Sequence, residues 1–116
     1  MVIGTGIIEI YIPQSHSLKE KRGVLRSLLK RTQNQFNISI AEVGDLDHWQ
    51  KGKIGFCVVG NDASYINSKI DKVLTFMENL FLAEIVRSKI EIMHFSDDDM
   101  LPHLHAMSGT HEFEKI

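Results

Sequence analysis

Apolar residues follow two different periods along this chain of 116 residues. Residues 2–12, 37–44, 49–60 and 85–95 are rich in β-branched and other apolar side chains bounded by turn residues, and each segment predicts a strand. In residues 17–35 and 63–80 the apolar positions recur every three to four residues, which predicts two helices. The first helix would bury Leu18, Leu25, Leu28, Leu29, Thr32 and Phe36, and the second Ile66, Ile70, Val73, Met77 and Leu80.

The predicted elements follow one another in the order β-α-β-β-α-β. This is the order of the ferredoxin-like α+β fold, in which a four-stranded antiparallel sheet carries two helices on one face. We expect residues 1–96 to form this domain, because a chain of this length suits a single core. Residues 97–116 begin with three aspartates and contain His103, His105 and His111, so we expect an irregular acidic tail there.

The first strand is apolar on both of its sides. Ile8 and Ile10 point one way, whereas Ile3 and Ile7 point the other. Strands that are apolar on both faces are usually covered on both faces. The helices cover only one face of the sheet, so we expect either a second subunit, in a homodimer, or the C-terminal tail to cover the other.

The first helix has a clear start signal. Ser17 and Glu20 have the spacing of a capping box, in which each side chain satisfies a backbone donor near the other. Lys21 lies closer to the apolar face than its basic neighbours, and we expect its aliphatic stem to pack there. Gly23 weakens the helix by roughly 1 kcal/mol relative to Ala unless a neighbour packs closely against it.

Positive charge is concentrated in this first helix. Residues 17–35 hold six of the thirteen Lys and Arg residues and one acid, for a net charge of +5, whereas the whole chain carries −2. Lys19, Arg22, Arg26 and Lys30 form one stripe, about 16 Å long at the helical rise per residue. A stripe of this kind is either a solvated helix face or a surface for an anionic partner. The scarcity of acids that could pair with it along the helix favours the partner.

Three stretches resemble a known family: Ser17-Leu18-Lys19-Glu20-Lys21-Arg22, Asn37-Ile38-Ser39-Ile40-Ala41-Glu42-Val43-Gly44-Asp45 and Asp47-His48-Trp49-Gln50. Over about residues 1–95 the chain resembles the YlxP-like family of small bacterial proteins of unassigned function. The resemblance implies a ferredoxin-like fold and no known catalytic residues. Genes of this family often lie beside those of translation initiation and ribosome maturation factors, which implies association with a ribosomal particle or RNA. The basic stripe is the surface that we expect to make this contact.

The turn between the second and third strands gathers Glu42, Asp45, Asp47 and His48 beside Trp49. Acids and a histidine at this spacing could hold a divalent cation, but a polar turn explains the same residues, and we expect no metal. Trp49 is either a lid on the core or an anchor for a partner. If the acidic turn did hold a metal, the protein could be an enzyme that uses it, and this is a third class of function for the chain.

The RNA-recognition motif shares this order of elements and stacks bases on aromatic residues of its central strands. Tyr11 and Phe56 fall near the positions that this would need, but Ile54 stands where a stacking aromatic is expected. We therefore expect Tyr11 and Phe56 to lie on a sheet face that is buried against another subunit.

The sequence contains no motif typical of a common enzyme class, a membrane protein or a secreted protein. No nucleophile elbow, phosphate-binding glycine loop or CxxC pair is present, so we expect no cofactor and no enzymatic activity. No apolar run is long enough to span a membrane, the signal-peptide pattern is missing, and a single cysteine suits a reducing cytoplasm. A small-molecule-sensing or dimerisation module of the same fold is the alternative to RNA association.

Overall fold

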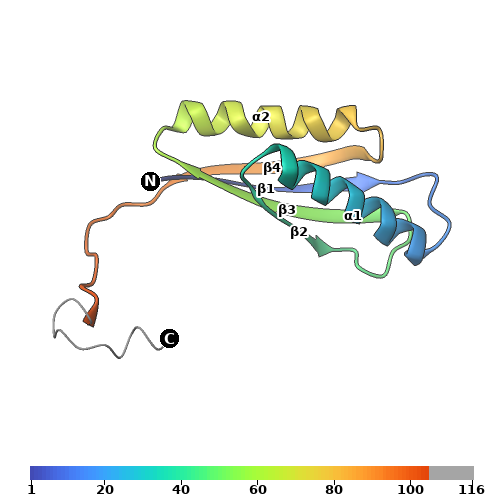
Figure 1. The fold of residues 1–116 in the computed structure, drawn as a ribbon, viewed down its shortest axis with the longest axis horizontal. Coiled ribbons are helices and arrows are strands. Elements are labelled where there is room, and N and C mark those ends of the chain that lie inside the picture. Colours follow the sequence, from blue (N-terminus) through green and yellow to red (C-terminus); the bar gives the residue numbers. More distant parts are fainter. Residues whose placement is uncertain (105–116) are drawn as a thin grey trace.

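The computed structural model describes residues 1–104, and the predicted order of elements is confirmed (Figure 1). Each predicted boundary lies within about two residues of the observed one. The elements are β1 (Val2–Tyr11), α1 (Leu18–Gln35), β2 (Ser39–Gly44), β3 (Lys51–Gly60), α2 (Ala63–Asn79) and β4 (Glu84–His94).

The four strands form one antiparallel sheet in the order β2-β3-β1-β4. Both helices lie on the same face of this sheet, with α2 packed on β1, β3 and β4, and α1 on β2 (Figure 1). The ferredoxin-like fold is therefore confirmed. The core lies between the helices and this face, where Ile8 of β1 and Ile54 of β3 are directly opposite and fully buried.

Gly4 and Gly6 of β1 make room for the core residues above them. A Cβ atom on Gly4 would lie 2.5 Å from Ile66 of α2, and one on Gly6 would lie 2.6 Å from the Phe56 ring. Only a residue without a side chain lets the helix approach the strand this closely. The two glycines thus have a packing role inside the strand.

The first helix begins as the capping-box residues predict, with one difference. The Ser17 hydroxyl accepts a hydrogen bond from the Glu20 amide at 3.1 Å. The Glu20 carboxylate, however, accepts from the amide of His16 at 2.6 Å and not from that of Ser17. Both side chains still satisfy backbone donors at the start of α1, so the helix end is fixed without any partner.

The sheet face away from the helices, which we call the open face, is uncovered by the described residues. It presents Ile7 and Val59, which are 45% and 55% exposed. After Phe95, whose amide donates to the Met1 carbonyl at 2.8 Å, the chain leaves the sheet and runs away from it (Figure 1). The tail up to residue 104 therefore does not cover the open face (Figure 1). His105 and His111 lie outside the described residues.

The prediction for Phe56 is wrong, because this ring does not lie on the open face. Phe56 is 3% exposed and packs in the core beneath the helices. Tyr11 does lie on the open face, because the odd-numbered residues of β1 point to that side. The paired aromatic platform of an RNA-recognition motif cannot form when its two rings lie on opposite sides of the sheet. Among residues 1–104, moreover, no helix has the length and hydropathy needed to cross a membrane.

Candidate nucleic-acid interface

The basic stripe of α1 is exposed along its whole length. The side chains of Lys19, Arg22, Arg26 and Lys30 all lie on the solvent side of the helix. Within residues 1–104, none of the four forms an ion pair or a side-chain hydrogen bond. Glu20, the one acid of the helix, is engaged with the amide of His16. The charge of the stripe is therefore available to an anionic partner.

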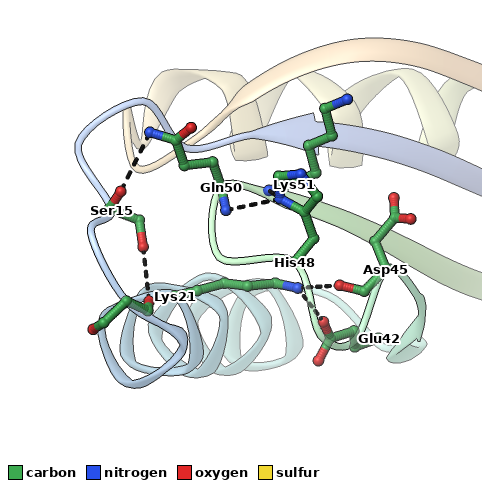
Figure 2. Close-up of polar contacts among 8 residues, drawn as sticks. Ser15, Lys21, Glu42, Asp45, His48, Gln50 and Lys51 are labelled. Carbon is green, nitrogen blue, oxygen red and sulfur yellow. Dashed lines mark hydrogen bonds and ion pairs between the residues drawn. The ribbon is translucent and has the colours of Figure 1, made fainter.

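Lys21 behaves differently from its neighbours on the same helix. It is fully buried, and its ammonium group lies 3.1 Å from Glu42 Oε2 of β2 (Figure 2). The same group donates a hydrogen bond to the backbone carbonyl of Asp45. A buried charge is tolerated only where a partner of opposite charge and hydrogen bonds compensate for the loss of water. Lys21 thus joins α1 to the β2–β3 hairpin and adds no charge to the surface.

The contact between Lys21 and Glu42 is an ion pair without an aligned hydrogen bond. Glu42 Oε2 is buried and accepts no hydrogen bond within the described part of the chain, although the ammonium nitrogen is close. The Coulomb attraction does not require the alignment that a hydrogen bond needs. The Glu42 side chain keeps 23% of its surface exposed, so water can reach the carboxylate in part.

Backbone groups and His48 shape the hairpin that receives Lys21. Asp45 adopts a left-handed backbone with φ of 55°, which aspartate tolerates better than most residues. Its carbonyl also accepts from the His48 amide at 3.1 Å. His48 Nδ1 in turn accepts from the amides of Gln50 and Lys51, each at 3.2 Å (Figure 2). This nitrogen is therefore occupied in holding the turn.

Gln50 ties the hairpin to the loop that precedes α1. Its side-chain amide donates to the Pro13 carbonyl at 3.3 Å. It also donates to the Ser15 carbonyl at 3.4 Å (Figure 2). Its carbonyl accepts from the Ile12 amide at 2.7 Å. Together with Lys21, these bonds fix the start of α1 against the turn between β2 and β3.

The acidic hairpin does not assemble as a metal site in the described residues. Across residues 1–104, no group of three or more His, Cys, Asp or Glu side chains is placed to hold a metal ion. Glu42 points toward Lys21, and His48 Nδ1 points into its own turn. Asp45 and Asp47 are exposed beside them. The arrangement is that of a charged turn with structural contacts.

Trp49 lies at the surface of the hairpin and does not act as a lid on the core. It is 42% exposed, and its ring faces that of His16 at 6.3 Å between centroids, tilted by 40°. His16 immediately precedes the capping residue of α1. The aromatic pair therefore lies beside the start of the helix that carries the stripe.

The pairing of Lys21 with Glu42 was missed from the sequence, although a signal was present. Lys21 falls between Leu18 and Leu25 on the apolar face of α1, at a position where a lysine is out of place. Glu42 shares a face of β2 with the buried Ile40. Charged residues are rarely buried unless they are paired, so a lysine and a glutamate that each lie on a buried face indicate an ion pair between them.

The open face carries its own ion-pair group. Arg87 of β4 donates to both carboxylate oxygens of Glu9 at 2.8 and 2.7 Å, and Lys53 lies 3.9 Å from the same carboxylate. The hydrogen bonds from Arg87 hold the pKa of Glu9 below its usual range. The hydrogen bonds to Glu9 also raise the pKa of Arg87 above its usual range. Glu9 is therefore charged at neutral pH.

These features define a ferredoxin-like α+β domain with a free basic stripe on its first helix. The family model described as "Protein of unknown function (DUF503)" matches residues 3–90, and the chain belongs to this family. The chain is also 38% identical over 78 residues to the "Uncharacterized protein YlxP" of Bacillus subtilis (strain 168), covering 67% of this chain and 85% of the relative. The resemblance to the YlxP-like family is thus confirmed.

Solved structures share the general arrangement at low similarity. The de novo designed protein Foldit4 matches 83% of this chain and 100% of its own, with a TM-score of 0.47 and 9% identity. A REP-associated tyrosine transposase bound to a REP hairpin matches 83% of this chain and 58% of its own, with a TM-score of 0.39 and 14% identity. At these scores neither likeness bears on function.

Proposed function

We propose that this chain is a non-enzymatic RNA-binding domain that associates with ribosomal particles through the basic stripe of α1. The observation that carries the proposal is the contrast within one helix. Lys21 is buried and compensated by Glu42, whereas Lys19 and Arg22 on either side of it are exposed and have no ionic partner among residues 1–104.

The stripe has the form that a phosphate backbone requires. Its four cations extend over about 16 Å of helix, so they can meet several phosphates of one strand. Each phosphate that Lys or Arg neutralises releases condensed counterions, which makes binding favourable at low salt and weak at high salt. The chain as a whole carries −2, so this attraction is local to α1.

The Lys21 contacts support the proposal by fixing the start of the stripe. Lys19 lies in the first turn of α1, which the Ser17 and Glu20 bonds and the Lys21–Glu42 pair hold against the hairpin. A fixed helix loses less conformational entropy on binding than a mobile one. Trp49, half exposed beside this turn, adds an aromatic surface on which an unpaired base could stack.

Charge reversal on the stripe tests the proposal. We expect Arg22→Glu combined with Arg26→Glu to abolish sedimentation of the chain with ribosomal particles at low salt. Circular dichroism should be unchanged, because both side chains are exposed and form no hydrogen bond or ion pair with other described residues.

A matched pair of single variants locates the effect. Arg26→Glu and Lys72→Glu change the net charge equally, but Lys72 lies on α2, outside the stripe, and is also exposed. Arg26→Glu should weaken sedimentation with the particles, and Lys72→Glu should leave it nearly unchanged. Equal behaviour of the two variants, or binding that survives the double reversal, would show that the stripe is only a solvated face.

A further inference from the structure

The open face has an ordered pattern across its central strands. The pairing of β1 with β3 and β4 sets side chains in rows perpendicular to the strands. An apolar row lies at one end, a row centred on Ile7 in the middle, and a charged row toward the other end. The rows are Ile3, Val59 and Met93; Ile7, Gly55 and Lys89; and Glu9, Lys53 and Arg87.

We propose that two copies of this chain pack their open faces together about a two-fold axis that runs parallel to the strands, midway between β1 and β3. This line is the centre of the sheet, because the strand order is β2-β3-β1-β4. Among axes parallel to the strands, this one therefore gives the largest overlap of the two faces, with β1 over the partner's β3 and β4 over the partner's β2. Face-to-face packing of two sheets is the ordinary solution for a sheet whose second face is apolar.

This axis keeps each row opposite the same row of the partner. Because Ile3 pairs with Val59 and Ile7 with Gly55 within the chain, Ile3 then faces the partner's Val59. Ile7, 45% exposed, faces the partner's Gly55, against which the Val43 side chain of β2 lies, 3.0 Å from where a Cβ atom of Gly55 would be. Ile7 thus meets an apolar surface that the glycine and Val43 form together.

The charges of the open face are complementary about the same axis. Glu9 pairs with Lys53 in the strand register, so Glu9 of each copy faces the partner's Lys53. Lys89 and Glu91 of β4 fall opposite the partner's Ala41 and Ser39, which brings no like charges together. An axis perpendicular to the strands would instead place Val59 over the partner's Lys51.

The size of the face suits a dimer that dissociates on dilution. Four strands spaced about 4.8 Å apart, with about 3.4 Å per residue along them, give a flat area on the order of 600 Å² per copy. Two copies bury about 1,200 Å² in total, at the lower limit of specific protein–protein interfaces. The α1 stripe lies on the opposite side of the sheet, so this proposal does not depend on RNA binding.

Sedimentation equilibrium of the full chain over a wide concentration range tests the proposal. We expect the apparent mass to rise from 13.2 kDa toward twice this value as the concentration increases. Ile7→Glu places a charge at the centre of the proposed interface and should keep the protein monomeric. Tyr65→Glu makes a comparable change on α2, where Tyr65 is 57% exposed, and should leave the dimer intact.

Cys57 provides a second measurement that needs no substitution. It lies on the open face and is half-buried, and the proposed axis places it against the partner's Thr5. The rate of its alkylation should fall as the protein concentration rises. A chain that stays monomeric, an Ile7→Glu variant that dimerises as Tyr65→Glu does, or an alkylation rate independent of concentration overturns the proposal. A monomer whose Cys57 is protected at every concentration would point to the chain's own tail as the cover.

Discussion

Lys19 and Lys21 are two residues apart on α1 and have opposite relations to solvent. Lys19 is exposed, whereas Lys21 is completely buried against Glu42 and the Asp45 carbonyl. The difference follows from the helical period, which turns successive side chains by about 100°. The family motif that contains both residues is therefore partly a folding signal and partly a candidate binding surface.

Removal of Glu42 should strongly destabilise the protein. Glu42→Ala leaves the Lys21 ammonium buried with a carbonyl as its remaining partner, so we expect the free energy of unfolding to fall by about 3 kcal/mol. Urea denaturation measures this change. The double variant Lys21→Met with Glu42→Leu should recover most of the loss, since it removes both buried charges.

Glu78→Ala is the control for this experiment. Glu78 is an exposed acid on α2, and surface substitutions of this kind change stability by about 0.5 kcal/mol or less. If Glu42→Ala were as mild as Glu78→Ala, the ion pair would have no structural role.

The Glu9–Arg87 pair should make stability depend on pH in the acid range. The pKa of Glu9 is lowered in the folded protein by the hydrogen bonds from Arg87. Its contribution is therefore complete above the ordinary carboxyl pKa and is lost as the pH falls through the lowered value. In an NMR titration, Arg87→Gln should raise the pKa of Glu9 toward its ordinary range. An unchanged pKa in the variant would contradict the pairing.

At the scale of elements, α1 tolerates a residue that the helix itself disfavours. Gly23 is exposed, and a Cβ atom placed on it would have no neighbour within 4 Å. The sequence suggested that a closely packed neighbour could account for a glycine here, but no such neighbour is present among the described residues. Packing inside the domain does not account for Gly23.

Gly23→Ala should accordingly stabilise the protein. Alanine restricts the unfolded chain and favours the helix by about 1 kcal/mol over glycine. Thermal unfolding followed by circular dichroism should show a higher Tm, with sedimentation to ribosomal particles unchanged. A lower Tm would mean that the helix needs flexibility or close contact at this position.

The elements could be predicted because their signals are local. Ser17 and Glu20 mark the start of α1, and the spacing of Leu25, Leu28 and Thr32 marks its buried face. The pairing of Lys21 with Glu42 could not be predicted with the same certainty, because it joins residues far apart in the chain and depends on the placement of α1 over β2. The role of Asp45 was hidden for another reason, since its backbone carbonyl makes the contact.

At the scale of the whole molecule, the two candidate surfaces lie on opposite sides of the sheet. The helices cover one face of the sheet (Figure 1), and the stripe of α1 is exposed to solvent. The open face is uncovered in the described residues. In the proposed dimer, the two stripes would both face outward, at opposite ends of a helix–sheet–sheet–helix assembly. Two linked sites on one RNA-rich particle would bind more tightly than one.

The salt dependence of RNA binding tests the central claim most directly. If the four cations of the stripe each neutralise one phosphate of a single strand, log Kobs should fall with log[salt] with a slope of about −3. Arg26→Gln should reduce the magnitude of this slope by about 0.7, whereas Lys72→Gln should leave it unchanged. A slope near zero, or one that Arg26→Gln does not alter, would contradict RNA binding through α1.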